Sequence, residues 1–332
     1  MTWFDELTGF AERTGDEVRS KLRLDGTRLS SLVNNRTFDA GNFTTPQLSA
    51  LRTQAVTVSG SRRIRIDELV GDVRKLHQDA ANEHAVFQVA SQFNCLEMAA
   101  PQITPEQGVG IYENDWTQGP ACSISAGAGT IFRNYFVPLN GRVGQTHDNQ
   151  IDCLAELAHH LNNEPNGYWR MQNGYCFPTP DGLAQIEDLL SAADEATLDE
   201  LRGKLKVGVQ SQTQVNVGDS KHLVTQVFCS ALPISYSGIP SMHWDHFPRL
   251  ILDATYEATF HVALRNFAET GCNKLYLTLV GGGVFGNKLD WILSAIGRSL
   301  QIFEAANLDV SIVSYGQSKP EVARFVASQK TL

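Results

Sequence analysis

Residues 274–292 read KLYLTLVGGGVFGNKLDWI, with three consecutive glycines between two regular patterns. The apolar, β-branched run 275–280 has the length of a strand. Apolar residues then repeat at helical spacing, at Leu289, Ile292, Ile296 and Leu300. A glycine turn between a strand and a helix lets backbone N–H groups approach an anion closely beside the helix N-terminus. The stretch predicts a diphosphate site, unless its glycines serve only the packing of a tight turn.

The composition excludes several classes of protein. The 332 residues carry 27 Lys and Arg against 36 Asp and Glu, a formal charge of −9, with no basic block. We therefore expect no nucleic-acid partner. The N-terminus lacks the pattern of a signal peptide and no run reaches the length of a membrane span, so we expect a cytoplasmic protein without a membrane partner.

Cysteine and histidine spacing does not predict a metal site. The six cysteines are widely spread without a CxxC pair, which favours reduced and mostly buried thiols. His243 and His246 could begin a metal site, but no further ligands follow at convincing spacing, so we expect no metal.

The chain divides into two kinds of sequence. Phe4, Leu7 and Phe10 repeat at helical spacing, and similar patterns continue, so residues 1–84 are predicted to form a helical N-terminal region packed on the core. From residue 85 onward strands and helices alternate, which indicates an α/β domain over residues 85–332 with a mostly parallel sheet covered on both faces.

Two polar segments follow the first core strand, predicted at residues 86–90. Gln92 and Asn94 come directly after it, where open α/β sheets bind ligands. The long loop-like segment 101–129 ends in the glycine-rich residues 126–130, and loops of this length usually serve a site. We expect Gly127, Gly129 and Thr130 to form a second glycine wall. Arg133 could pair with either an acid or a ligand.

Carboxylates gather near a predicted helix at residues 250–267. Asp253 and Glu257 are four residues apart and share one helix face, and Asp245 lies in the preceding aromatic loop. Carboxylates that meet beside a ligand raise one another's pKa, which prepares an acid and a base near neutral pH. Alternatively, Asp253 only complements the helix dipole.

The order of five motifs resembles the macrodomain superfamily over residues 85–318. These motifs are a VASQFNCLE strand end, a GAGT loop, a SALP strand end, a GGGVFGN loop and a final DVSIVSYG strand. The chain departs from the usual pattern because Ser-Gln-Phe-Asn replaces Ala-Ala-Asn after the first strand, and the first glycine loop comes late. It also lacks the Gln-Glu-Glu stretch of poly(ADP-ribose) glycohydrolases. It is most similar to effector-type macrodomains that remove ADP-ribose from arginine, including on ubiquitin.

The resemblance implies a three-layer α/β/α mixed sheet and a hydrolase of the N-glycosidic bond in an ADP-ribosylated protein, with ubiquitin among the candidate substrates. ADP-ribose would be the ligand and no cofactor would be needed. The mechanism that we hypothesise uses these residues: Asp245, Asp253 and Glu257 for acid and base; Gly281, Gly282, Gly283, Val284, Phe285 and Gly286 for the diphosphate, closed by Gly127, Gly129 and Thr130; Asn94 for the ribose; Tyr315 for adenine; and Gln92 and Asn287 as further ligand-binding residues. The alternative is an ADP-ribose reader without turnover.

Overall fold

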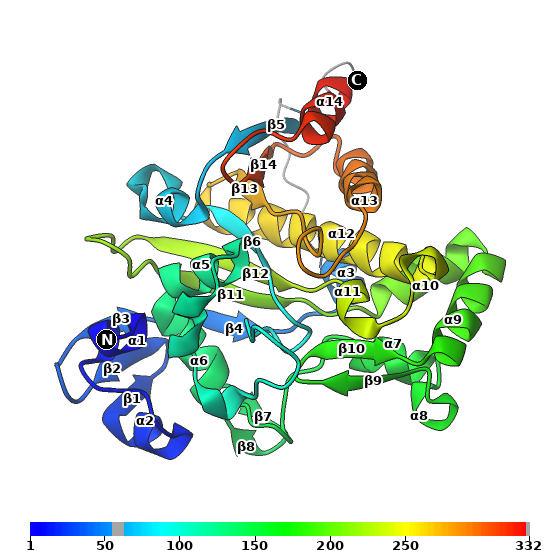
Figure 1. Ribbon diagram of the computed structural model, residues 1–332. Helices are drawn as coiled ribbons and strands as arrows, with labels where there is room; N and C mark the ends of the chain where they lie inside the picture. The colour runs from blue at the N-terminus through cyan, green and yellow to red at the C-terminus, as the bar shows by residue number, and fades with distance from the viewer. Residues whose placement is uncertain (55–62, 330–332) are drawn as a thin grey trace.

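A seven-stranded sheet forms the centre of the computed structural model, which describes residues 1–54 and 63–329 (Figure 1). In spatial order its strands are β4 (Asn42–Thr44), β11 (Gly208–Gln214), β12 (Leu223–Cys229), β6 (Val86–Ala90), β13 (Lys274–Leu277), β14 (Asp309–Ser314) and β5 (Arg65–Val70). The strands from β12 to β5 are parallel, whereas β11 runs antiparallel to both its neighbours. The predicted mixed α/β sheet is therefore confirmed.

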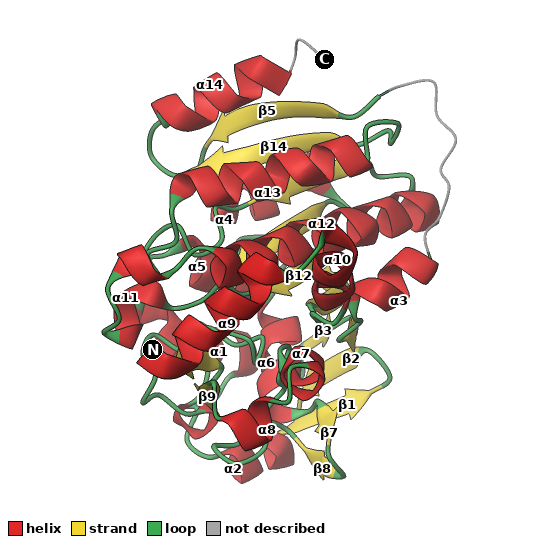
Figure 2. Ribbon diagram, turned by 90° about the vertical axis from the view of Figure 1, so that its right-hand side faces the viewer, coloured by secondary structure: helices red, strands yellow, loops and turns green. Residues whose placement is uncertain are grey.

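Helices cover both faces of the sheet, and alternate residues of β6 show how. Phe87 stacks at 3.8 Å on His77 of α4 (Val73–Gln78), while the Gln88 amide donates to the Thr259 hydroxyl of α12 (His246–Thr270) at 2.9 Å. Neighbouring side chains thus enter opposite layers, as a pleated strand requires. The α4 layer also contains α5 (Gln118–Ser125) and α6 (Gly127–Tyr135), and α13 (Leu289–Ile302) packs beside α12 (Figure 2).

The other elements surround these three layers. Helices α3 (Leu48–Thr53), α9 (Pro180–Ala192) and α10 (Glu195–Gly203) pack on α12, and α14 (Pro320–Gln329) packs on β5. Short elements fill the connections: α7 (Ala155–His160), α8 (Asn163–Asn166), α11 (Ile234–Ser237), and the hairpins β7 (Pro138–Leu139) with β8 (Arg142–Val143) and β9 (Trp169–Gln172) with β10 (Tyr175–Pro178). Within residues 1–54 and 63–329, no helix is long and apolar enough to cross a membrane.

The N-terminal region contains helices and, in addition, strands that its helical periodicity did not predict. Its helices are α1 (Trp3–Thr8), α2 (Gly15–Lys21), α3 and α4; its additional sheet is β1 (Leu22–Asp25), β2 (Arg28–Ser31) and β3 (Thr37–Asp39). Gly26, at φ 59°, turns β1 into β2, and Asp-Gly is a strong hairpin signal. Strands β4 and β5 from the same region form the two edges of the main sheet, so residues 1–84 help to build the core domain.

The N-terminal residues pack on the long segment that precedes α6. Phe4, Leu7 and Phe10 share a buried apolar cluster with Val109 and Tyr112. The Glu12 carboxylate accepts from the backbone N–H groups of Val109 and Gly110 at 2.9 and 2.6 Å, and the Tyr135 hydroxyl donates to it at 2.6 Å. The N-terminal region therefore holds a segment that reaches the site described next.

Candidate functional site

A cavity of about 320 Å³ lies at the carboxyl ends of β6 and β13. This is the edge at which α/β sheets bind ligands. Its walls come from the strand ends, the segment before α5, the hairpin β9–β10 and the glycine loop, and include Ser91, Gln92, Glu97, Asp115, Gly119, Tyr175, Tyr236, Val280, Gly281, Gly283, Val284 and Phe285.

The glycine loop is closed by its first and last residues. Gly281 and Gly286 have φ of 73° and 77°, which glycine adopts without strain. Asn287 donates its backbone N–H to the Gly281 carbonyl at 2.9 Å and its side-chain amide to the Leu232 carbonyl at 2.8 Å. Asn287 and Gly286 do not line the cavity, and their roles are to shape the loop.

The middle of this loop presents unpaired donors to the cavity. Gly282 uses its N–H within the loop, on the Leu279 carbonyl at 3.0 Å. Among the described residues, no acceptor meets the backbone N–H groups of Gly283, Val284 and Phe285, all of which line the cavity. Consecutive free N–H groups of this kind form an anion-binding concavity.

The second wall comes from the start of α5, and the expectation for Gly127, Gly129 and Thr130 was wrong. Gln118 and Gly119 line the cavity, and their N–H groups have no acceptor within the part of the chain that the structure describes. Such groups at a helix N-terminus attract anions. The expected residues lie instead in the buried helix α6, outside the cavity lining.

The glycines of α6 serve close packing. A Cβ on Gly127 would lie 2.5 Å from the Trp3 ring, and one on Gly129 would lie 2.8 Å from the Thr213 hydroxyl. Thr130 donates its hydroxyl to the Ser123 carbonyl at 2.6 Å. Glycine-rich sequence here allows a helix to approach its neighbours, whereas the sequence pattern suggested a loop.

Glu97 is the acidic side chain buried in this cavity, with 4% of its surface exposed. Burial raises its pKa well above the ordinary 4.5, and the charge of Asp115 raises it further, against a lowering by Arg133. A raised pKa favours the protonated form of Glu97, the form that can donate a proton. The sequence offered one signal for it, a glutamate within the apolar residues Phe93, Leu96 and Met98.

Asp115 supplies a second carboxylate to the same cavity. It is half-buried, and its Oδ1 accepts the Thr117 backbone N–H at 2.8 Å. The two carboxyl groups thus sit in different environments, one buried and one partly in solvent, which is how acid and base roles are separated.

Three aromatic rings form a side wall. Tyr175, Tyr236 and Phe285 lie pairwise within 5.4 to 5.7 Å, centroid to centroid. The Tyr175 hydroxyl donates to the Met98 carbonyl at 2.7 Å, which fixes the ring. Tyr236 remains 37% exposed, so this wall offers a flat apolar surface.

Gln92, Asn94 and Tyr315 were all expected to bind the ligand, and of these three only Gln92 lines the cavity. Its side-chain oxygen accepts the Met98 N–H at 2.7 Å. Asn94 is fully buried and structural, because its amide donates to Gln150 at 2.9 Å and its oxygen accepts from Leu96. Tyr315 follows β14 and is 60% exposed, outside the lining.

The three carboxylates expected to be catalytic lie outside the cavity, and Asp245 is the most exposed of them. It pairs with Arg249 one helical turn later at 2.7 Å, and this hydrogen bond lowers its pKa. An exposed carboxylate held ionised by arginine is poorly suited to donate a proton.

Asp253 and Glu257 do share one face of α12, as their spacing predicted, but that face packs on other helices. Asp253 pairs with Arg202 at 3.2 Å. Glu257 pairs with Arg52 at 2.5 Å and Arg298 at 2.6 Å. The arginines come from α10, α3 and α13, so the structure places Asp253 and Glu257 in ion pairs between helices and not in the cavity.

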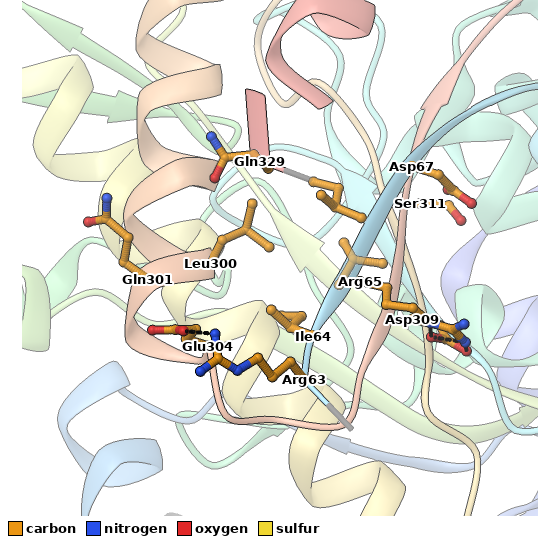
Figure 3. Close-up of a pocket in the computed structure, with 12 residues that line it drawn as sticks. Arg63, Ile64, Arg65, Asp67, Leu300, Gln301, Glu304, Asp309, Ser311 and Gln329 are labelled. Carbon is orange, nitrogen blue, oxygen red and sulfur yellow. Dashed lines mark hydrogen bonds and ion pairs between the residues drawn. The ribbon is translucent and has the colours of Figure 1, made fainter. Parts of the chain in front are cut away.

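A larger hollow of about 840 Å³, seen among the described residues, lies at the opposite end of the sheet, beside the first residues of β5 and β14 (Figure 3). Four of its charged side chains form ion pairs, Arg63 with Glu304 and Arg65 with Asp309 on the neighbouring strand, each at 2.7 Å. Because these charges satisfy one another on the surface, we assign no ligand to it. No group of three or more His, Cys, Asp or Glu side chains within the described ranges could hold a metal ion.

Comparisons with known proteins find similarity only at the level of structures. No protein-family model matches the chain, and no curated protein matches it. A poly(ADP-ribose) glycohydrolase from Thermomonospora curvata is 12% identical, with a TM-score of 0.44 over 96% of both chains. The glycohydrolase from Deinococcus radiodurans in complex with ADP-ribose is also 12% identical, with a TM-score of 0.42 over 87% of this chain and 92% of that one. At this similarity the comparison does not identify site residues, whose chemistry rests on the geometry above.

Proposed function

We propose that the cavity binds ADP-ribose and that the protein hydrolyses the glycosidic bond joining ADP-ribose to a protein side chain. The observation that carries this proposal is the pair of donor rows that face one cavity. Gly283, Val284 and Phe285 present free N–H groups from the glycine loop, and Gln118 and Gly119 present theirs from the start of α5. A diphosphate between the two rows would satisfy both.

The remaining walls suit the rest of the ligand. The rings of Tyr175, Tyr236 and Phe285 offer stacking surface for adenine or for the apolar face of a ribose. The motif order that resembles macrodomains supports the same ligand, because its GGGVFGN loop supplies one of the donor rows.

Glu97 and Asp115 divide the chemistry in this proposal. Neutral Glu97 donates its proton to the leaving atom of the modified side chain as the bond to the anomeric carbon breaks. Water attacks that carbon and passes its proton to the Asp115 carboxylate, as paired carboxylates do in glycoside hydrolysis. The products are free ADP-ribose and the unmodified side chain.

The finer part of the proposal is the linkage. We propose an arginine N-glycosidic bond, with ubiquitin as the first protein to test, because the order of the five sequence motifs resembles effector-type macrodomains of that specificity. The structural neighbours are named for poly(ADP-ribose), so the polymer belongs in the same panel.

The test combines turnover with binding. Wild-type protein and Glu97→Gln are incubated with ADP-ribosylarginine peptide, ADP-ribosylated ubiquitin, serine- and ester-linked conjugates and poly(ADP-ribose), and released ADP-ribose is quantified. We expect Glu97→Gln to lose about 10²- to 10⁴-fold in turnover. Calorimetry should show unchanged affinity for ADP-ribose, because a neutral amide replaces a neutral acid of the same shape.

The control is Glu269→Gln, a change of the same type in an exposed pair with Arg265 on α12. Binding without release from any substrate would identify a reader. Absence of ADP-ribose binding at millimolar concentration would refute the proposed ligand.

A further inference from the structure

Arg133 is a buried arginine behind the wall of the cavity. None of its surface is exposed, and its guanidinium lies 3.6 Å from the centroid of the Phe228 ring. It donates through Nε to the Cys95 carbonyl at 3.1 Å and through Nη2 to the Thr130 and Ser123 hydroxyls at 3.1 and 3.3 Å. Within residues 1–54 and 63–329, no carboxylate comes close enough to form an ion pair with it.

These contacts give the hydrogen bonds a direction. A guanidinium has only donors, so the Ser123 oxygen must accept from Arg133. The single hydroxyl hydrogen of Ser123 is then free for its other neighbour, Glu97 Oε1, at 3.4 Å. The chain therefore runs one way, from Arg133 through Ser123 to one oxygen of Glu97.

The second carboxyl oxygen of Glu97, Oε2, lies beside a residue of the cavity wall. A Cβ placed on Gly119 would lie 2.6 Å from Glu97 Oε2, and Gly119 itself lines the cavity. Glycine at this position leaves room for the carboxyl group beside the start of α5. Oε1 is thus held from behind by a donor, and Oε2 lies on the side where a ligand would bind.

We propose that Arg133 and Ser123 are positioning residues that keep the proton of the Glu97 carboxyl group on Oε2, the oxygen beside the cavity residue Gly119. An oxygen that accepts a hydrogen bond from Ser123 is the carbonyl oxygen of the acid, so the O–H belongs to the other. The catalytic consequence rests on the proposed function, whereas the hydrogen-bond relay does not.

Several titratable groups surround Glu97 and act on its protonation. Burial raises its pKa first, Asp115 and Cys95 add to this, and Arg133 and Ser123 lower it by favouring the anion. Tyr112 on the 3₁₀ helix Gly110–Asn114, Cys122 on α5 and Tyr175 on β10 also face it, all neutral thiols or phenols whose pKa burial raises. Removing Ser123 or Arg133 should therefore raise the Glu97 pKa further, because the anion loses support.

The experiment reads the Glu97 carboxyl group directly. Infrared difference spectra are recorded across a pH titration of the full chain, and the protonated carboxyl band of Glu97 is assigned by its loss in Glu97→Gln. We expect Ser123→Ala and Arg133→Met to shift the band frequency and to move its titration midpoint upward by about 0.5 to 1 unit. With a hydrolysed substrate, turnover at the pH optimum should fall on the order of tenfold.

Ser125→Ala is the matched control. Ser125 is two residues along the same helix, equally buried, and its hydroxyl bonds its own helix at the Ala121 carbonyl at 2.8 Å. We expect it to leave both the band and the midpoint unchanged.

The outcomes separate the two proposals. An unchanged band and midpoint in Ser123→Ala would overturn the relay, even in an active enzyme. A shifted band in a protein that releases no ADP-ribose would uphold the relay and refute the proposed hydrolysis. Ser123→Ala removes one hydroxyl and decides the question if Arg133→Met does not fold.

Discussion

Two buried glutamates on opposite sides of the sheet show how partners decide what a carboxyl group does. Glu97 and Glu257 are 4% and 2% exposed, respectively. Glu97 meets one neutral donor, the Ser123 hydroxyl at 3.4 Å, and burial raises its pKa. For Glu257, burial would also raise the pKa, but hydrogen bonds from His261, Arg52 and Arg298 lower it overall.

The difference teaches that burial alone does not identify a catalytic acid. Glu257 belongs to a network that ties α3, α10 and α13 to α12, in which Arg52 and Arg298 also reach Asp199 at 2.8 and 3.2 Å. Its charge is required for structure. Glu97 lacks such a partner, so burial favours its protonated form beside the cavity, where it is available for chemistry.

The largest expected effect that separates the two is on stability. Glu257→Gln should lower the free energy of unfolding by about 2 to 4 kcal/mol, because Arg52 and Arg298 lose the more buried of the two carboxylates that they share. Turnover per folded molecule should stay unchanged. Urea unfolding measures the free energy of unfolding, and kinetics normalised to the concentration of folded protein measure turnover. Glu97→Gln is the matched change and should lower the free energy of unfolding only a little. A large loss of stability in Glu97→Gln together with a small loss in Glu257→Gln would contradict the comparison.

The pH dependence of stability should differ in sign between the two sites. The folded pKa of Glu97 is raised, so its contribution is fully present below its unfolded pKa, near 4.5, and is lost as pH rises. Wild type should therefore lose stability relative to Glu97→Gln as the pH rises above about 4.5.

The folded pKa of Glu257 is lowered, so its contribution is present above pH 4.5 and is lost as pH falls below that value. The difference in the free energy of unfolding between wild type and Glu257→Gln should accordingly become smaller as the pH falls below 4.5. Urea unfolding at a series of pH values gives the free energy of unfolding of wild type and both variants as a function of pH. If this free energy depended on pH in the same way for Glu97→Gln and Glu257→Gln, the two carboxyl groups would titrate alike, which would contradict the comparison.

A smaller effect should come from placing a charge among the free donors. A Cβ on Gly283 meets no atom within 4 Å, so Gly283→Asp and Gly283→Ala both fit the fold. The aspartate should weaken ADP-ribose binding about tenfold or more by repelling the diphosphate, whereas alanine should change it little. Calorimetry at two salt concentrations provides the measurement. Equal affinities for the two variants would place the diphosphate elsewhere.

The smallest effect is expected for Asp245→Asn. Its exposed pair with Arg249 should contribute less than about 0.5 kcal/mol to stability, and turnover should remain at the wild-type level. A large loss of turnover would return the catalytic role to Asp245 and remove it from Glu97.

Local sequence was sufficient for β13 and for the glycine loop that follows it, but not for the strands within residues 1–84. Residues 275–280 and the glycines after them indicated a strand and a turn because both depend on nearby residues alone. The α6 glycines misled for the opposite reason, since their cause is contact with Trp3 and Thr213, far away in sequence. The spacing of Asp253 and Glu257 correctly placed them on one helix face, but only Arg52, Arg202 and Arg298 reveal what that face meets.

The two edges of the sheet set the order in which this chain can finish folding. Edge strand β5 is made early in synthesis, yet its neighbour β14 comes 244 residues later, as the pair Arg65 and Asp309 shows. Edge strand β4 likewise waits for β11. Pairing over such separations is slow, and strand edges exposed meanwhile invite aggregation. Nascent chains that end before β14 should therefore depend on chaperones, and the yield of native protein should be decided only after β14 is made.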